Sequence, residues 1–218
     1  MLDLQSCFGE RHKYYEKTIL TTIDKQTGQI SDAIDLLVES LRNGFSVRFL
    51  GAGRARLVAA VPANRLCHAG ANVSIISDTI PMPNTRLGGF VFAVSASGTS
   101  IDVINAMEKA RKRRDAGAEE GGRIIKPITI PIVGISALTG KDKYQKLCDR
   151  FQAACDVFIH IQVDTAEKSD FNHLGDNEEH VIMELLDFMV ACAINITGRK
   201  NEILHEDLGP TGEMFAIN

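Results

Sequence analysis

The chain has 218 residues, of which 44% are hydrophobic and 24% are charged, enough apolar material for the core of one globular domain. This composition excludes a disordered or fibrous chain. The formal net charge is −4 at pH 7, so there is no basic excess to neutralise the phosphates of a nucleic acid, and no nucleic-acid partner is expected.

The first predicted elements are two amphipathic helices between Arg11 and Gly44. Apolar residues recur at helical spacing in two stretches, and Gly28 lies between them. Ser31 is typical of a helix start, so we expect the second helix to begin there. Gly44 suits the position just past the last turn of that helix, because glycine tolerates the left-handed conformation.

From residue 46 onward, predicted strands alternate with predicted helices. The strands are Ser46–Leu50, Asn72–Ser77, Gly89–Ser95, Ile128–Ile135 and Val157–Val163. The helices are a stretch from Arg54 to Gly70, Ile101–Arg114, Tyr144–Ala154 and Asn177–Ile196. Right-handed crossovers place such helices on both faces of a parallel sheet. The expected fold class is therefore α/β, a doubly wound three-layer α/β/α sandwich around a five-stranded, mostly parallel sheet.

We expect a single domain over residues 1–218, with N-terminal helices over 1–45, an α/β core over 46–196 and a C-terminal tail over 199–218. A charged, glycine-rich insert around Lys112–Arg123 and the tail with Gly209-Pro210 fall outside the alternation. Both are expected to be exposed loops, because their charge and their Gly/Pro content cannot support a core element.

The cysteines predict neither a disulfide framework nor a zinc site, because they are scattered and form no Cys-x-x-Cys pair. They are Cys7, Cys67, Cys148, Cys155 and Cys192. The opening stretch Met1–Lys17 is charged and lacks the apolar core of a signal peptide, and no apolar run is expected to approach a membrane span. We expect a cytoplasmic protein with no membrane partner.

Ligands of open parallel sheets bind at the carboxyl ends of the strands, and the first candidate segment there is Gly51-Ala52-Gly53-Arg54. It has the first two glycines of a dinucleotide-binding fingerprint. Arg56 stands where the third glycine would be needed, which disfavours NAD. The alternative is a tight strand-to-helix turn that binds nothing.

The second candidate segment is Ser95-Ala96-Ser97-Gly98-Thr99-Ser100, between the third strand and a helix. Hydroxyls and a flexible glycine occur there at a helix start, where free N–H groups and the positive end of the helix dipole converge. This arrangement predicts a site for one phosphate group. The alternative is capping of the helix by Ser97 or Thr99, which would require only one hydroxyl.

The third candidate segment is Asn177-Glu178-Glu179-His180, at the start of the last helix. Its carboxylates can either stabilise the helix dipole or act as a general base. His68, close to the end of a helix before Gly70, can likewise be a capping cation or a catalytic group.

In combination, these segments resemble the sugar isomerase (SIS) domain family, and within it most of all the 6-phospho-3-hexuloisomerases. The resemblance covers about Ile30–Ile196. The matching segments are Gly51–Ala55, Arg65–Gly70, Asp78-Thr79, Ser95–Ser100 and the last helix with its leading glutamates.

The resemblance implies a domain that binds a phosphorylated sugar and interconverts fructose 6-phosphate and a 3-hexulose 6-phosphate through an enediol, without a cofactor. It implies that Ser95, Ser97 and Ser100 surround the phosphate and that Thr99 contributes its backbone. The remaining substrate-binding positions that it implies are Gly51, Gly53, Arg54, Thr79 and Gly98.

The resemblance also places Glu179 at the position of the carboxylate base and His68 at a histidine of the hexuloisomerases. One carboxylate can carry a proton between two neighbouring carbons, while His68 and Arg54 are candidate donors to the enediolate oxygens. Because SIS domains commonly build sites at subunit contacts, a homo-oligomer, dimer or tetramer, is implied, with His68 serving a neighbour's site.

Three residues depart from the family pattern. Ala55 replaces a serine and Ala96 replaces a glycine. Pro62 lies inside the helix before His68, where we expect it to kink the helix and displace His68.

Two alternatives stay open. A non-catalytic SIS module that senses a phosphosugar would share the fold and the phosphate loop, although no helix-turn-helix segment accompanies it here. A phosphoheptose-type isomerase would need a metal site, for which the local candidates are His160, His173, His180 and Asp176. Their spacing matches no recognised ligand pattern, so no metal is predicted.

Overall fold

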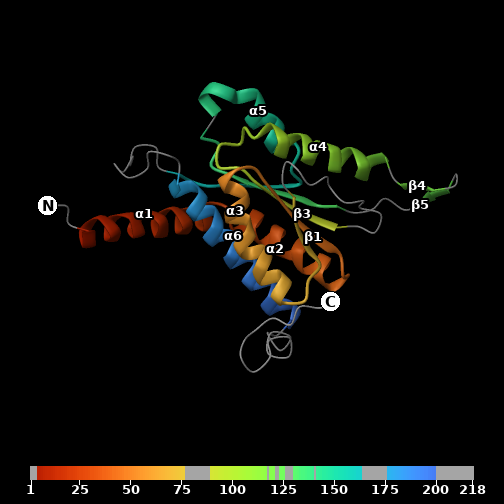
Figure 1. Cartoon of the computed structure of the whole chain (residues 1–218), viewed down its shortest axis with the longest axis horizontal. Coiled ribbons are helices and arrows are strands. Elements are labelled where there is room, and N and C mark those ends of the chain that lie inside the picture. The colour runs from red at the N-terminus through yellow and green to blue at the C-terminus, as the bar shows by residue number, and fades with distance from the viewer. Residues whose placement is uncertain are drawn as a thin grey trace, which may run out of the picture.

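The computed structural model of the chain describes residues 4–76, 89–116, 118–120, 123–125, 130–139, 141–163 and 176–199. Five parallel strands form one sheet with helices on both faces, so the α/β class and the three layers are confirmed (Figure 1). The strands are β1 (Ser46–Gly51), β2 (Val73–Ile76), β3 (Gly89–Val94), β6 (Ile132–Ser136) and β7 (Val157–His160). The helices are α1 (Leu4–Lys25), α2 (Thr27–Arg42), α3 (Arg54–His68), α4 (Ile101–Ala116), α5 (Lys141–Ala153) and α6 (Asp176–Thr197).

The strand order is β2-β1-β3-β6-β7, and the two faces of the sheet carry different helices. Val47 and Phe49 of β1 pack in a core with α2, α3 and α6. Leu50, on the opposite face of the same strand, packs in a second core with α4. The helix after β1 therefore covers one face and the helix after β3 covers the other.

The boundary between α1 and α2 lies at Gln26, so the prediction that the second helix begins at Ser31 is wrong and Gly28 lies inside α2. The side-chain amide of Gln26 donates to the carbonyl of His160 and accepts from its N–H at 2.9 Å. Thr22 Oγ1 accepts from Gln162 N at 3.0 Å. These side chains bond the backbone at the end of the edge strand β7, beyond which the described residues contain no further strand of the sheet.

α3 runs from Arg54 to His68 and continues through Pro62. Pro62 is buried, with its ring on the core side of the helix beside Ala59 and Ala63. α3 therefore continues past Pro62, whose ring we expected to kink the helix, and it ends at His68 rather than at the predicted Gly70.

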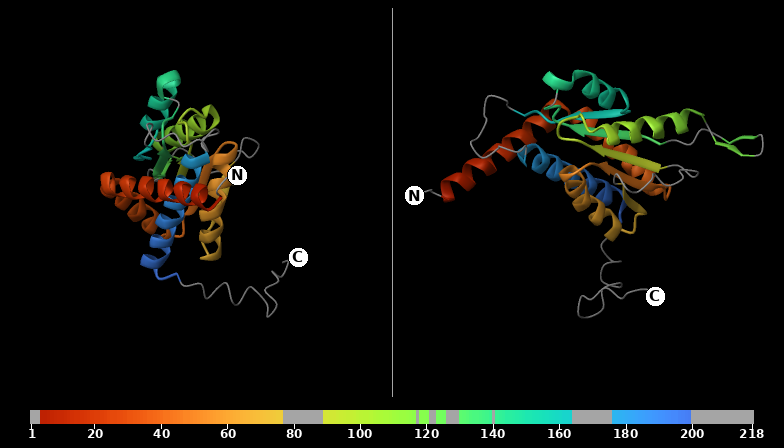
Figure 2. Two further views of the ribbon diagram at one scale, coloured as in Figure 1. Left: turned by 90° about the vertical axis from the view of Figure 1, so that its left-hand side faces the viewer. Right: turned by 45° about the horizontal axis from the view of Figure 1, so that its top comes forward.

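The insert after α4 is not a loop throughout, which corrects the sequence-based expectation. α4 continues to Ala116, and Ala118–Glu120 (β4) pairs antiparallel with Arg123–Ile125 (β5). This hairpin projects from the end of α4, away from the sheet (Figure 2). Two three-residue strands carry too little periodic signal to be recognised in a charged, glycine-rich sequence. Residues 200–218 of the predicted tail lie outside the described part of the chain.

α6 is apolar over Asn177–Thr197, with a mean hydropathy of 1.5, and is long enough to cross a membrane by length and composition alone. The expectation that no segment approaches a span is therefore wrong by this measure. In the fold, Val181, Leu185 and Met189 of α6 are fully buried in the core shared with α2 and α3. The apolar face of α6 is thus explained by its position as a core helix.

Candidate functional site

The candidate site lies where β1 and β3 end side by side. Gly51 and Val94, the last residues of these strands, are paired in the sheet. Because α3 and α4 leave toward opposite faces, the loops that follow β1 and β3 diverge at this point. Such a switch in strand order is where open α/β sheets bind ligands.

The turn after β1 needs both of its glycines. A Cβ at Gly51 would lie 2.8 Å from the backbone nitrogen of Arg56, so no side chain fits there. Gly53 precedes the first residue of α3 with φ +57°, in the left-handed region that favours glycine. The tight turn accounts for this part of the motif, and it places Arg54 at the start of α3.

The loop after β3 gathers four hydroxyls at the start of α4. Ser95 Oγ lies 3.1 Å from Ser100 Oγ, and Ser97 Oγ lies 2.8 Å from Thr99 Oγ1. The Ser100 carbonyl accepts from Ile104 N at 3.0 Å, which begins the helix. The structure thus brings together the residues that were predicted to bind a phosphate, and their binding role stays a prediction.

These hydroxyls also shape the loop itself. Gly98 N donates to Ser95 Oγ at 3.1 Å, and Thr99 N donates to Ser97 Oγ at 3.3 Å. In the described structure Ser97 therefore bonds within the loop rather than to the first turn of α4. This arrangement favours a built loop over helix capping by Ser97.

The loop is supported from the next strand. Gly98 has φ +71°, and a Cβ there would lie 2.6 Å from Leu138 Cδ2. Ser136, the fully buried last residue of β6, donates from Oγ to the Ala96 carbonyl at 3.3 Å and accepts from Leu138 N at 3.0 Å. Ser136 was not among the predicted site residues, because its only signal in the sequence is that it is a polar residue at the end of an apolar strand. The φ angle of Ala96 is not positive, so alanine is tolerated at this position, where the family pattern has glycine.

Arg54 and Glu179 meet at the same edge of the sheet, although they are far apart in the sequence. Arg54 Nε lies 3.0 Å from Glu179 Oε2. The Arg54 side chain is 48% exposed, and that of Glu179 is 15% exposed. Glu179 lies in the first turn of α6, after the buried Asn177 and Glu178. The fold therefore joins the candidate base to the candidate enediolate donor.

His68 lies at the far end of α3 from Arg54. Fourteen residues separate the two along one helix, which corresponds to about 21 Å at 1.5 Å per residue. His68 is exposed there, beside the end of the helix at Ala69. The structure consequently does not bring His68 to Glu179 within one chain.

The remaining predicted positions do not assemble a further site. Thr79, Asp78 and His173 lie outside the described residues. His160 Nε2 lies 3.3 Å from the Ala137 carbonyl, whereas His180 packs on α1. Within the described ranges, no group of three or more His, Cys, Asp or Glu side chains could hold a metal ion.

Comparison with known proteins supports part of this picture. No family model matches the sequence. An uncharacterized protein of Aeropyrum pernix is 34% identical over 95 residues, or 43% of this chain and 44% of that protein. The 3-hexulose-6-phosphate isomerase of Methylomonas aminofaciens is 26% identical over 100 residues, or 45% of this chain and 55% of that protein. The matches thus span about half the length of these curated relatives.

Solved structures match nearly the whole chain. A Methanococcus jannaschii protein, whose structure infers a function of 3-hexulose-6-phosphate isomerase, has a TM-score of 0.64 at 17% identity and covers 89% of this chain and 94% of its own. The chain has the sugar isomerase (SIS) fold. The resemblance that the sequence motifs indicated is therefore confirmed at the level of the fold.

Proteins with different roles share this SIS fold. An Escherichia coli CFT073 protein in complex with arabinose-5-phosphate has a TM-score of 0.58 at 12% identity and covers 91% of this chain and 95% of its own. The Vibrio vulnificus NanR protein complexed with ManNAc-6P has a TM-score of 0.56 at 15% identity and covers 88% of this chain and 66% of its own. The SIS fold alone therefore does not decide between catalysis and binding.

Proposed function

We propose that this chain is a phosphosugar isomerase that interconverts a 3-hexulose 6-phosphate and fructose 6-phosphate. The observation that carries the proposal is the meeting of Arg54 and Glu179 at the sheet edge where the hydroxyl loop, Ser95–Ser100, also lies. The named isomerase of Methylomonas aminofaciens and the SIS fold support the same reaction class.

In the proposed complex, the hydroxyl loop binds the phosphate group. Ser95, Ser97 and Ser100 supply hydroxyl donors, and the start of α4 supplies backbone N–H groups and the positive end of its dipole. When the phosphate binds, the loop hydroxyls give up the hydrogen bonds that they make with each other and form hydrogen bonds to phosphate oxygens. A fixed phosphate then holds the reacting carbons at a constant distance from Glu179.

Glu179 is the proposed base. A carbonyl moves from carbon 3 to carbon 2 when a proton leaves carbon 2, a 2,3-enediol forms, and a proton returns to carbon 3. The Glu179 carboxylate takes the first proton and gives it back at the neighbouring carbon. The hydroxyl proton of oxygen 2 passes to oxygen 3 in the same sequence, so no other reactant is needed.

Arg54 has two successive partners in this mechanism. It pairs with Glu179 at 3.0 Å, and its side chain is 48% exposed, which leaves it room to turn toward an entering sugar. When Arg54 turns to the negative charge that develops on the enediolate, it stabilises that charge. The same movement removes a cation from the carboxylate and makes Glu179 a stronger base.

His68 enters this proposal only through a second subunit. It lies about 21 Å along α3 from Arg54, so we propose that it completes the site of a neighbouring chain in a homo-oligomer. We place the reaction in the cytoplasm, as the cysteine usage indicates.

A second candidate function is phosphosugar sensing without turnover. The NanR protein complexed with ManNAc-6P shares the fold, and this favours a module in which the same loop binds a ligand and Glu179 only pairs with Arg54. The two functions differ in one property, which is whether a carbon-bound proton of the sugar exchanges with solvent.

The deciding experiment is incubation of the protein with fructose 6-phosphate in deuterated water, followed by NMR. Deuterium at carbon 3 would show a 2,3-enediol and support the proposed reaction. Deuterium at carbon 1 would show an aldose–ketose isomerase instead. Saturable binding without any label would contradict catalysis on this sugar and favour the sensing module.

A further inference from the structure

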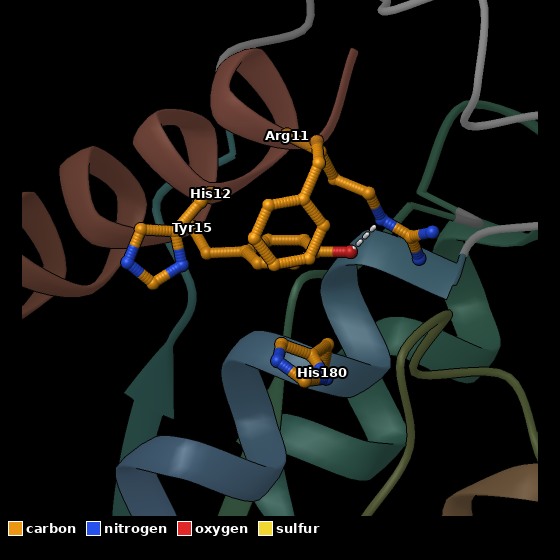
Figure 3. A pocket seen from close by; sticks show the side chains of 5 residues that line it. Arg11, His12, Tyr15 and His180 are labelled. Atoms are coloured by element: carbon orange, nitrogen blue, oxygen red, sulfur yellow. Dashed lines mark hydrogen bonds between the residues drawn. The ribbon is translucent and has the colours of Figure 1, made fainter. Parts of the chain in front are cut away.

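A cavity lies between α1 and the start of α6. The N-terminal half of α1 extends past the sheet, as two views show (Figures 1 and 2). Beneath it lies a cavity of about 360 Å³, lined by Phe8, Arg11, His12, Tyr15 and His180 (Figure 3). This volume is within the range of small-molecule sites, roughly 300–1,000 Å³.

The walls of the cavity are ring systems. Phe8 and His12 stack with their planes 5° apart and their centroids at 6.3 Å. Tyr15 lies against His180 of α6 with a centroid distance of 4.5 Å. Phe8 is 74% exposed, so one wall faces both the cavity and solvent. Such walls offer flat apolar faces against which another ring can stack.

The cavity also concentrates cationic and cationisable groups in a chain with a net charge of −4. Among the residues that the structure describes, its lining includes Arg11, His12 and His180 but no carboxylate. The Arg11 guanidinium lies 5.4 Å from the Tyr15 ring centroid, and its Nε donates to the Tyr15 hydroxyl. In the described structure, no ion pair engages Arg11, whereas His180 lies 2.9 Å from Glu184. The cavity therefore presents a positioned guanidinium to an anion.

We propose that this cavity binds a small planar aromatic anion, that is, an aromatic ring that carries one phosphate or carboxylate group. The ring would stack on the Phe8–His12 and Tyr15–His180 pairs, and the anionic group would bond the terminal nitrogens of Arg11. Guanidinium groups bind both kinds of anion through two parallel bonds, and they stack on aromatic faces.

This site is separate from the phosphosugar site. His180 follows Glu179 in α6, and successive residues of a helix point about 100° apart. Glu179 accordingly faces Arg54 of α3, whereas His180 faces Tyr15 of α1. The proposal depends on the α1–α6 cavity alone and holds whether or not the chain is an isomerase.

The test is calorimetric titration of the full chain with four probes. They distinguish the contribution of the aromatic ring to binding from that of the negative charge. AMP carries a ring and a phosphate, and indole-3-acetate carries a ring and a carboxylate. Adenosine has only the ring, and inorganic phosphate has only the charge. We expect AMP and indole-3-acetate to bind, and the other two to bind about tenfold more weakly or worse.

Three variants locate the binding. Arg11→Gln should weaken AMP binding about tenfold or more, since the charge-assisted bonds are lost. Lys13→Gln removes the same charge from an exposed neighbour on α1 that does not line the cavity, and it should leave AMP binding unchanged. Ser97→Ala should leave it unchanged as well. Circular dichroism confirms that each variant is folded.

Three results would overturn the proposal. The first is the absence of saturable binding of both ring-bearing anions. The second is AMP binding that is lost in Ser97→Ala but kept in Arg11→Gln, which would assign the nucleotide to the hydroxyl loop. The third is a change of oligomeric state in Phe8→Ser by analytical ultracentrifugation, which would make this face of α1 a contact between copies of the chain.

Discussion

Two ion pairs join α3 to α6, and they differ in where along the helices they lie. Arg54 and Glu179 meet in the first turns of both helices, beside the carboxyl ends of β1 and β3. Arg65 and Asp187 meet further along both helices, where Arg65 Nε and Nη2 donate to the two carboxylate oxygens at 2.6 and 2.7 Å. The chemical groups are the same, but their surroundings are not.

The position of each pair along the sheet decides what it can do. The Asp187 carboxylate holds the Arg65 guanidinium and raises the pKa of Arg65, an arrangement that fixes one helix to the other. Arg54 and Glu179 lie beside the hydroxyl loop, at the edge where a sugar phosphate would approach. The Arg65–Asp187 pair is therefore interpreted as part of the scaffold and the Arg54–Glu179 pair as part of the site.

The largest effect is expected from Glu179→Gln. The amide cannot take a proton from carbon, so turnover should fall by at least about 100-fold, as for loss of a general base. Phosphosugar binding should persist, because the hydroxyl loop is untouched. The measurement is deuterium exchange into fructose 6-phosphate, with calorimetry for binding.

The matched control is Asp187→Asn, which removes a carboxylate from the same helix. It should change the exchange rate by less than about twofold, because an exposed ion pair contributes little to the fold and this one is remote from the loop. Equal losses of turnover in both variants would show that the two pairs do not differ in function.

A mixture of two inactive variants tests whether His68, at the far end of α3, completes the site of a neighbouring subunit. His68→Gln and Glu179→Gln chains are each expected to be inactive. If sites are shared between subunits, each mixed dimer contains one site with both native residues, so refolding the two together should restore about a quarter of the native activity. No recovery in a mixture that forms dimers would exclude His68 from the neighbour's site.

Ser97→Ala is expected to affect binding rather than turnover. Loss of one hydrogen bond to a charged phosphate should weaken phosphosugar binding by about 10- to 100-fold. The dissociation constant from calorimetry is the readout, and the melting temperature shows whether the loop keeps its structure. An unchanged dissociation constant would contradict phosphate binding in this loop.

The hydroxyl loop and the glycine turn could be predicted from sequence because each is contiguous. Ser95–Ser100 lies between a strand and a helix that are both recognisable from their apolar patterns, so its place at the sheet edge follows. The pairing of Arg54 with Glu179 depends on the packing of α3 against α6, and no local sequence pattern predicts which helices pack together. The resemblance assigned both residues to a site, but only the fold shows their contact.

The start of the second helix is set by a long-range contact, and it was predicted wrongly. Ser31 is a good local start for a helix, yet the break falls at Gln26, whose side chain bonds the backbone of His160 in β7. Tertiary contacts overrode local propensity there. Ser136 was missed for the same reason. Its side chain supports a loop that is distant in the sequence, and its sequence neighbours do not indicate this role.

A third arginine differs from Arg54 and Arg65 because it lies in the interior of the protein. Arg48 of β1 is 4% exposed, and its Nε and Nη1 are buried without a hydrogen-bond partner in the described structure. Burial lowers the pKa of Arg48, because desolvation disfavours the charged form. Arg48→Met should therefore raise the free energy of unfolding in urea by about 1–3 kcal/mol.

Arg48→Lys is the matched control, because it keeps a positive charge at the same place. It should give no gain in stability. A loss of stability in Arg48→Met would show that the guanidinium has a role in the native fold that its neighbours do not reveal.

The smallest effect is expected for the Arg150–Glu108 ion pair, which resembles the Arg65–Asp187 pair but joins α5 to α4. Arg150 donates to both oxygens of Glu108 at 2.9 Å and lowers the pKa of Glu108 below its ordinary value of 4.5. A carboxyl with a lowered pKa contributes stability above its ordinary pKa and loses it as the pH falls through the lowered one. Because both side chains are substantially exposed, Glu108→Gln should lower the melting temperature at pH 7 by less than about 2 °C.

The pH dependence separates this pair from other effects of the substitution. As the pH falls through the lowered pKa of Glu108, the native side chain loses its charge, so the difference in melting temperature between native chain and variant should shrink toward zero. Arg150→Gln should give the same pH dependence, because it removes the other half of the pair. A difference that persists undiminished as the pH is lowered until the carboxyls are protonated would mean that packing, and not the ion pair, connects α4 to α5 at this position.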